Sequence, residues 1–266
     1  MKTVFERIFK TLRIHILKGL SSYKVGINSK GDITKYFDKF CETKIISMLQ
    51  KSGIKAVIIS EELKKTITIN PSAKSGLHYI IIDPVDGSDN YLSGVPFVCL
   101  GIAVFDAEME PVYSLAGNYF TGDWFYADKM FLYLNGKKFN ASKAAKKPED
   151  IIYFAFTDTA VNLDNKFREI FLHSSGKVRS LGATIGELML VIKGGAKSLV
   201  DVRGKLTPEN FAPFFLIARH TKACFTDEYG NVFKLRSKLL TDEYNVVFSN
   251  NPREHAKTLA KLVKFL

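Results

Sequence analysis

A chain of 266 residues, of which 46% are apolar and 24% charged, can bury a sizeable core and is not an intrinsically disordered protein. No stretch approaches the ~18–20 uncharged apolar residues of a membrane-spanning helix. The basic N-terminal segment lacks the continuous apolar run of a signal peptide, so we expect a cytoplasmic protein without membrane attachment.

The net charge of +11 has two interpretations. It favours an anionic partner, either a phosphorylated metabolite or a nucleic acid. Alternatively, the charge reflects a lysine-rich solvated surface. The sequence shows no RGG, zinc-finger or RNP-like pattern, which does not favour nucleic acid as the main partner. The cysteines Cys41, Cys99 and Cys224 lack CxxC spacing, and we expect three buried, reduced thiols.

The first fifty residues predict two helices joined by a polar loop. Over residues 1–20, Val4, Ile8, Leu12 and Leu17, together with neighbouring apolar residues, form a stripe at near-helical spacing. A second apolar pattern over residues 35–49 predicts another helix. The first stripe suits packing on the protein's own core better than binding to a membrane surface, because its polar face carries both acidic and basic residues.

The remaining chain alternates strands and helices, which indicates an α/β layered protein. Apolar and aromatic runs predict strands at 56–59, 79–82, 97–105, 112–117, 123–126, 152–156 and 198–202. Amphipathic patterns predict helices at 166–173, 184–193, 209–220 and 254–265.

Carboxylates follow two of the predicted strands, at Glu61-Glu62 and at Asp83-Pro84-Val85-Asp86. Strands that are apolar at every position lie inside a sheet, and their carboxyl ends are where open α/β sheets place ligand sites. If the two strands are neighbours, Glu61, Asp83 and Asp86 converge, and a hard cation such as Mg²⁺, Mn²⁺ or Ca²⁺ relieves their repulsion. The alternatives are a solvated strand end for Glu61-Glu62 and an ordinary turn around Asp83.

The octapeptide Asp83-Pro84-Val85-Asp86-Gly87-Ser88-Asp89-Asn90 resembles the D-P-[IL]-D-G-[ST]-x-N signature of the inositol monophosphatase superfamily. That superfamily also includes fructose-1,6-bisphosphatases and 3′-phosphoadenosine 5′-phosphate phosphatases. Other segments resemble further family motifs in the same order along the chain. These segments are Gly31 to Asp38, Ser60 to Glu62, Gly94 to Phe97, Arg179 to Thr184, Val200 to Ala212 and Asp227 to Gly230.

The resemblance implies a layered αβαβα sandwich and a Mg²⁺-dependent phosphoric monoester hydrolase that forms a homodimer. It implies a single phosphatase domain over residues 1–266, with subdomains of about 1–145 and 146–266. Inositol-1-phosphate is the first expected substrate, fructose-1,6-bisphosphate the second and 3′-phosphoadenosine 5′-phosphate the third. Two or three Mg²⁺ ions, or Mn²⁺ in their place, are expected at the site.

The resemblance also assigns roles to individual residues. The expected catalytic residues are Glu61, Ser88 and Asp38; the metal ligands are Glu61, Asp83, the carbonyl of Val85, Asp86 and Asn210; the phosphate-binding residues are Gly87 and Ser88; and the substrate-binding residues are Arg179, Gly182, Ala183 and Thr184. For Asp38 a second interpretation stays open, namely a first-turn carboxylate favoured by the helix dipole.

Asn210 departs from the family pattern, which has an aspartate at this position as a ligand of the second metal. Asparagine offers a carbonyl oxygen but no charge, so the resemblance implies weaker binding of the second cation. Glu209 is the neighbouring carboxylate that could substitute for it. Two hypotheses follow: an active phosphatase, or a catalytically weakened protein that binds a phosphorylated metabolite. A nucleic-acid-binding protein, suggested by the charge alone, is a third.

Overall fold

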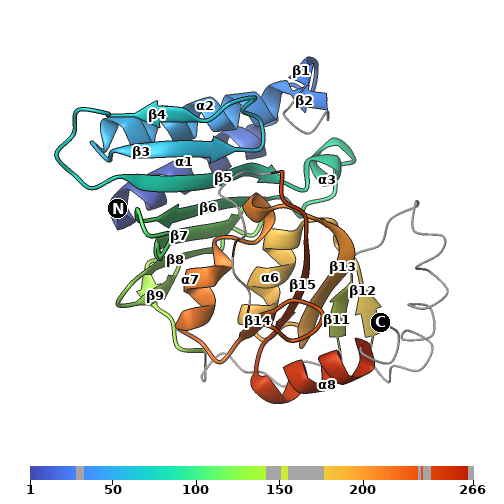
Figure 1. Cartoon of the computed structure of the whole chain (residues 1–266). Coiled ribbons are helices and arrows are strands. Elements are labelled where there is room, and N and C mark those ends of the chain that lie inside the picture. The colour runs from blue at the N-terminus through green and yellow to red at the C-terminus, as the bar shows by residue number, and fades with distance from the viewer. Residues whose placement is uncertain (28–32, 142–150, 155–176, 233–234, 236–240, 263–266) are drawn as a thin grey trace.

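Two β-sheets form the frame of the protein (Figure 1). The structure, a computed structural model, describes residues 1–27, 33–141, 151–154, 177–232, 235 and 241–262. Within these residues the larger sheet has eight strands, in the order β10 (Lys137–Lys138), β9 (Leu132–Leu134), β8 (Trp124–Asp128), β7 (Pro111–Asn118), β6 (Cys99–Phe105), β5 (His78–Asp86), β3 (Ala56–Ser60) and β4 (Ile67–Ile69).

The smaller sheet has five strands in the same described residues. Their order is β12 (Lys177–Arg179), β11 (Ile151–Phe154), β13 (Ser198–Leu206), β15 (Tyr244–Ser249) and β14 (Cys224–Thr226). A separate ribbon pairs β1 (Lys24–Ile27) with β2 (Ile33–Lys35) in antiparallel fashion.

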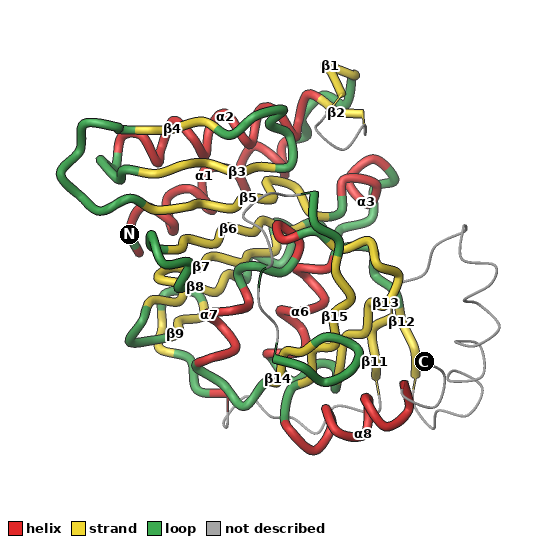
Figure 2. Tube along the Cα trace, viewed as in Figure 1, coloured by secondary structure: helices red, strands yellow, loops and turns green. Residues whose placement is uncertain are grey.

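Helices cover the sheets on both sides and fill the space between them. They are α1 (Lys2–Lys18), α2 (Tyr36–Lys51), α3 (Ser88–Leu92), α6 (Thr184–Ile192), the 3₁₀ turn η1 (Pro208–Asn210), α7 (Phe214–Arg219) and α8 (Pro252–Leu262). Helices α1 and α2 cover the outer face of the larger sheet, α6 and α7 lie between the sheets, and α8 covers the outer face of the smaller sheet, as Figure 2 shows. The expected αβαβα sandwich is therefore confirmed.

The larger sheet is buried on both faces at strand β5. Ile80 and Ile82 pack in the core under α1 and α2, while Ile81 packs on the opposite face with Ala212. Because neighbouring residues of a strand point to opposite faces, a strand covered on both sides must be apolar at every position. The run before Asp83 is therefore apolar because of its place in the sandwich.

The two N-terminal helices lie close to the predicted ranges. In α1 the buried face is Phe5, Ile8, Phe9, Leu12 and Ile16, which follows helical spacing. Leu17 is 44% exposed, so its assignment to the buried stripe was wrong. None of the described helices combines the length and hydropathy that crossing a bilayer would require.

The helix predicted at 209–220 is confirmed over its second half as α7, whereas its first residues form the 3₁₀ turn η1, and α7 begins only after Pro213. Proline has no amide proton, and its ring clashes with the carbonyl four residues earlier, which here belongs to Glu209. The predicted helix at 184–193 is confirmed as α6, and the one at 254–265 as α8, which begins at Pro252; the prediction at 166–173 lies outside the described residues.

The thiols are free, as the cysteine spacing predicted. Cys41 and Cys99 are buried, whereas Cys224 is only partly buried, so the expected burial was wrong for that residue. Cys224 lies on β14, which is an edge strand of the smaller sheet within the described residues, and an edge strand is less covered than a central one.

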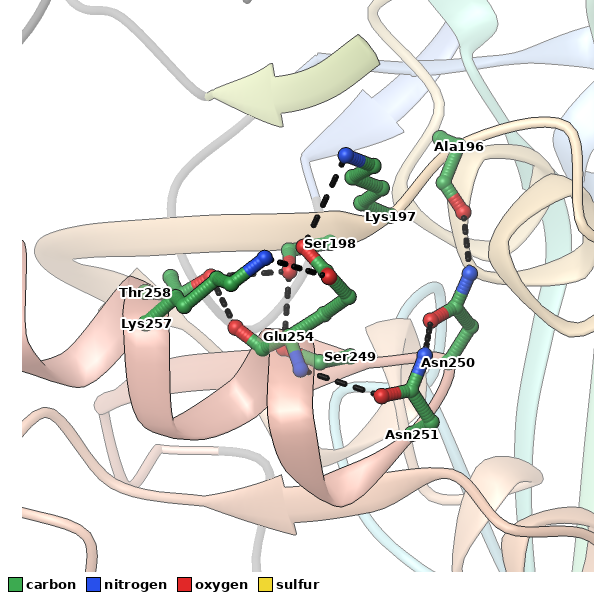
Figure 3. A network of polar contacts seen from close by, with 9 residues as sticks. All are labelled: Ala196, Lys197, Ser198, Ser249, Asn250, Asn251, Glu254, Lys257 and Thr258. Carbon is green, nitrogen blue, oxygen red and sulfur yellow. Dashed lines mark hydrogen bonds and ion pairs between the residues drawn. The ribbon is translucent and has the colours of Figure 1, made fainter. Parts of the chain in front are cut away.

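A buried network of hydroxyl groups attaches α8 to the smaller sheet (Figure 3). The Ser198 Oγ on β13 lies 2.8 Å from the Ser249 Oγ on β15 and 2.9 Å from the Thr258 Oγ1 on α8. At the edge of this network an ion pair joins Lys197 to Glu254, with 3.7 Å between Nζ and Oε2. Buried hydroxyl groups need partners, so these side chains fix α8 in position against the strands.

We expect the substitution Ser198→Ala to lower the free energy of unfolding by about 1–3 kcal/mol, because it leaves two buried hydroxyl groups short of a partner. Chemical denaturation measures this change. The matched substitution Ser72→Ala, at an exposed serine, should change the free energy of unfolding by less than about 0.5 kcal/mol. Equal effects of the two substitutions would contradict the role given to the network.

Candidate active site

The tips of β3 and β5 lie side by side. The two strands pair in parallel, with Ser60 opposite Ile82, and the Glu61 amide donates to the Ile82 carbonyl at 3.4 Å. Glu61 and Asp83 therefore leave the sheet at the same edge. The two strands are therefore neighbours, which is the condition that the sequence analysis set for the convergence of these carboxylates.

The end of β5 is bent around Pro84. The pairing register with β6 shifts between Asp83 and Asp86, since proline cannot donate to the ladder. The Tyr119 hydroxyl donates to the Pro84 carbonyl at 2.8 Å, and the Val85 amide donates to Asp83 Oδ1 at 3.1 Å. We expected the strand to end at Asp83, but it resumes and ends at Asp86. The bend keeps both aspartates buried in the same short segment.

Gly87 turns the chain from β5 into α3. Its φ of 87° lies in the left-handed region, and a Cβ atom at this position would lie 3.0 Å from both the Ala183 Cβ and the Phe97 carbonyl oxygen. Only glycine fits such a turn without strain. Ser88 follows as the first residue of α3 and is half-buried.

Asp38 lies in the first turn of α2, where the Lys35 amide donates to its Oδ2 at 3.2 Å. Burial raises the pKa of Asp38 from 3.8 to about 8, and the charge of the nearby Glu62 adds to the effect, as does that of Glu61. Thr34 Oγ1 donates to Glu62 Oε2 at 2.5 Å. Asp38 is therefore both a helix-capping carboxylate and a neighbour of the acidic strand end, so the two interpretations of this residue are compatible.

Asp86 joins the same group from the other side. Burial raises its pKa from 3.8 to about 8, while the Ile185 amide, which donates to Oδ2 at 2.7 Å, opposes the increase. The charges of Glu187 and Glu61 raise it further. Because Glu61 acts on both Asp38 and Asp86, and Glu62 acts on Asp38, these four side chains are electrostatically linked. Together with Asp83, which follows the apolar run of β5 beside them, they are called the acidic cluster below.

Glu187 is a member of the site that the sequence did not predict. It lies in the first turn of α6, and its Oε1 accepts from the Leu181 amide at 2.5 Å. Burial raises its pKa from 4.5 to about 7, and the Leu181 and Gly182 amides lower it. A lone carboxylate among apolar residues of a predicted helix is the signal that could have revealed it, since buried carboxylates require partners.

Asn210 reaches the acidic cluster through its amide group. Its Nδ2 donates to Asp83 Oδ2 at 3.3 Å, and its Oδ1 accepts from the Thr207 amide, also at 3.3 Å. The neighbouring Glu209 is buried, and its Oε1 accepts from the Thr207 hydroxyl. Asn210 thus lies where the sequence placed it, beside Asp83, but with its nitrogen facing the carboxylate.

The expected substrate-binding residues differ in their burial. Ala183 is buried against Gly87, and Thr184 is the first residue of α6. Arg179 is exposed at the end of β12, where its Nη1 donates to the carbonyl of Val178 at 2.7 Å. In the described part of the chain no hydrogen bond joins Ser88 to Asp38, although both border the same site.

The acidic cluster suits a hard divalent cation. Its donors are carboxylate oxygens, and the raised pKa values of Asp38 and Asp86 show that desolvation and repulsion disfavour their ionised forms. Among the described residues, no three His, Cys, Asp or Glu side chains converge closely enough to form a finished metal cage. Without a cation, close carboxylates either separate or take up protons. A hard cation that binds their oxygen atoms allows them to stay close together in the ionised form.

Comparison with known proteins places the chain and its fold in a family. Residues 4–266 match the model of the inositol monophosphatase family. The chain belongs to this family. Its relatives are named as phosphatases, and the protein is a phosphoric monoester hydrolase.

Two curated relatives and one solved structure illustrate the similarity. A fructose-1,6-bisphosphatase/inositol-1-monophosphatase of Methanocaldococcus jannaschii is 29% identical over 251 residues, which cover 94% of this chain and 93% of that protein. A fructose-1,6-bisphosphatase of Pyrococcus furiosus is 30% identical over 241 residues, covering 90% and 87%. A crystal structure of an inositol monophosphatase–fructose 1,6-bisphosphatase superposes with a TM-score of 0.79 at 29% identity, covering 100% of this chain and 99% of the other.

We expect the stability of the metal-free protein to show the raised pKa of Asp86. The folded-state pKa of about 8 lies above the ordinary value of 3.8, so the folded protein holds a proton that the unfolded chain releases between these pH values. Asp86 therefore stabilises the fold at low pH, and this contribution is lost as pH rises toward 8. The variant Asp86→Asn cannot titrate at this position and keeps an oxygen that can accept from Ile185.

The measurement is the difference in free energy of unfolding between wild type and Asp86→Asn at pH 5, 6, 7 and 8, with a chelator present. Wild type should lose stability relative to the variant as pH rises. A difference that stays constant, or that changes in favour of wild type at high pH, would show that Asp86 is an ordinary carboxylate.

Proposed function

We propose that the protein is a Mg²⁺-dependent phosphatase that hydrolyses inositol-1-phosphate first and fructose-1,6-bisphosphate second. The observation that supports this most strongly is the acidic cluster at the paired tips of β3 and β5, where Asp38 and Asp86 both have raised pKa values. Carboxylates arranged in this way repel one another, and a hard cation that binds their oxygen atoms relieves this repulsion.

Glu61, Asp83 and the carbonyl of Val85 would hold one cation, and Asp83 and Asp86 a second. Bound cations would lower the pKa of water and neutralise charge on the leaving alkoxide. The amides of Gly87 and Ser88 would bind the phosphate, because the left-handed turn at Gly87 exposes backbone donors at the start of α3.

Proton transfer would fall to side chains on the strand and helix ends. Glu61 would accept a proton from the attacking water, and Ser88 would orient that water with Asp38 behind it. Asp38, with its pKa raised to about 8, holds a proton more readily than an exposed carboxyl does, which suits a group that exchanges protons near neutral pH.

The choice of substrate rests on the relatives and on charge. Two of the relatives described above have names that carry fructose-1,6-bisphosphatase activity, one of them together with inositol-1-monophosphatase activity. The net charge of +11 would raise the local concentration of an anionic metabolite. 3′-Phosphoadenosine 5′-phosphate ranks third. A homodimer and a cytoplasmic location also stay predictions.

Asn210 favours a second candidate, a protein that binds a phosphorylated metabolite with little turnover. Its amide nitrogen donates to Asp83, whereas an aspartate would place negative charge there. To offer its oxygen to a cation, the Asn210 amide would have to turn over and give up its contact with Thr207. Our proposal is that the remaining carboxylates keep the site active at a higher Mg²⁺ concentration.

Release of phosphate from a panel of inositol-1-phosphate, fructose-1,6-bisphosphate and 3′-phosphoadenosine 5′-phosphate separates these candidates. We expect Mg²⁺-dependent turnover of the first two. The variant Asp83→Asn should lower kcat by at least about a hundredfold, because cation binding supplies several kcal/mol of charge stabilisation. The matched variant Asp106→Asn, just beyond the far end of β6, should keep wild-type turnover. Thermal stabilisation by these ligands without turnover would favour the binding protein instead.

We expect Asn210→Asp to lower the Mg²⁺ concentration for half-maximal rate roughly tenfold, a change of about 1.4 kcal/mol that is modest beside the Coulomb energy of a close charge pair. A Mg²⁺ titration at saturating substrate measures this. The control Asn231→Asp adds the same charge on an exposed turn and should leave the titration unchanged. An unchanged Mg²⁺ requirement in Asn210→Asp would refute our account of this position.

A further inference from the structure

The backbone of Leu181 is held at both its carbonyl and its amide. Its carbonyl accepts from the Asn90 Nδ2 at 2.7 Å, and its amide donates to the Glu187 Oε1 at 2.5 Å. Asn90 ends the signature octapeptide on α3, whereas Glu187 belongs to α6. Two elements far apart in the sequence thus hold the backbone of one residue, each through a different one of its two flanking peptide bonds.

Asn90 also holds a third segment. The same Nδ2 donates to the Phe97 carbonyl at 2.9 Å, so both of its protons go to backbone carbonyl groups. The turn around Gly182 packs directly on this side chain, because a Cβ atom at Gly182 would lie 3.2 Å from the Asn90 Oδ1. Gly182 has a φ of 73°, so the tight approach and the left-handed conformation both require glycine.

These hydrogen bonds lie where the 179–184 segment touches the turn at Gly87 and Ser88, which is called the phosphate loop below because it is proposed to bind the phosphate. Gly87, at the start of α3, packs against Ala183, and Asn90 is three residues further along the same short helix. A shift of the Leu181 backbone would therefore change the distance between the phosphate loop and the 179–184 segment, which is proposed to face the rest of the substrate. Rigid placement of binding groups is worth a large factor in rate, and small misplacements are costly.

We propose that Asn90 is a positioning residue that sets substrate selectivity by fixing the 179–184 segment relative to the phosphate loop. The inference rests on the proposed function, since it takes that loop and that segment as the two parts of one substrate site. Asn90 itself acts through Leu181 and Phe97 and touches no reacting atom in this account. Glu187 supports the same residue by accepting from its amide.

The substitution Asn90→Asp replaces the donor by oxygen atoms that face two carbonyl groups. Asn90→Leu keeps the size of the side chain without the new charge, which separates lost hydrogen bonds from added repulsion. The matched control is Asn70→Asp. Asn70 Nδ2 likewise donates to two carbonyls, those of Gln50 and Ile54, each at 2.9 Å, and it follows β4 at the edge of the larger sheet.

Three readouts test the proposal. We expect both Asn90 variants to raise KM for inositol-1-phosphate about tenfold, the equivalent of one or two lost hydrogen bonds. The kcat/KM for p-nitrophenyl phosphate, which lacks the hydroxyl-bearing ring, and the affinity for inorganic phosphate should change less than about threefold. Hydrogen–deuterium exchange of the Leu181 and Gly182 amides should accelerate. Asn70→Asp should leave all three at wild-type values even where it lowers Tm.

Equal losses on both substrates, an effect confined to Asn90→Asp, or unchanged exchange at Leu181 and Gly182 would each overturn the proposal. The exchange measurement needs no turnover. If wild type hydrolyses no member of the metabolite panel, the proposed function fails, and unchanged exchange in the Asn90 variants then separately refutes the positioning role.

Discussion

The site depends on the conflict between burial and charge at two strand tips. Because the larger sheet is covered on both faces, the side chains that follow β3 and β5 leave a dry interior, and in this chain they are carboxylates. Burial disfavours their ionised forms, and each carboxylate disfavours ionisation of the next. The raised pKa values of Asp38 and Asp86 follow from this conflict, and the charge of Glu61 acts on both residues. Under the proposed function, hard cations would resolve this conflict and would also supply the charge stabilisation that phosphate ester hydrolysis needs.

The surrounding structure keeps the cluster in place. The bend at Pro84 holds two aspartates within one buried turn, and the Tyr119 hydroxyl fixes that bend. On the other side, the Ile185 amide at the start of α6 donates to Asp86, which links the larger sheet to the helical layer between the sheets. The cluster is therefore built by both halves of the sandwich, and changes in the middle helix layer should reach the site through Asp86.

The sequence predicted those features that depend on local pattern. Apolar runs revealed β3 and β5, and the parallel pairing of these strands brought their carboxylates to one edge as expected. The octapeptide signature indicated the family that the comparison then showed. Local pattern was misleading where one residue overrode it: Pro213 splits the predicted helix at 209–220 into η1 and α7. The apolar pattern on which that prediction was based does not register the missing amide proton of one proline, although the residue itself is visible in the sequence.

What the sequence did not predict are contacts between distant segments. Glu187 lies in an apolar helix, and although its bond to the Leu181 amide is local, its charge acts on Asp86, about a hundred residues earlier. The bond from Asn90 to Leu181 spans 91 residues, and the bond from Ile185 to Asp86 spans 99. Such pairs follow from tertiary packing. The orientation of the Asn210 amide is of the same kind, since Thr207 and Asp83 together determine which atom faces the cluster.

The central claim is that cations replace protons on this acidic cluster. Isothermal titration of Mg²⁺ or Mn²⁺ into metal-free protein at pH 7, repeated in buffers of different ionisation enthalpy, counts the protons released on binding. With Asp38 and Asp86 at pKa values of about 8, we expect saturable binding that releases protons, and less release at pH 9. The absence of binding at saturating metal, or binding without proton release at pH 7, would contradict the account.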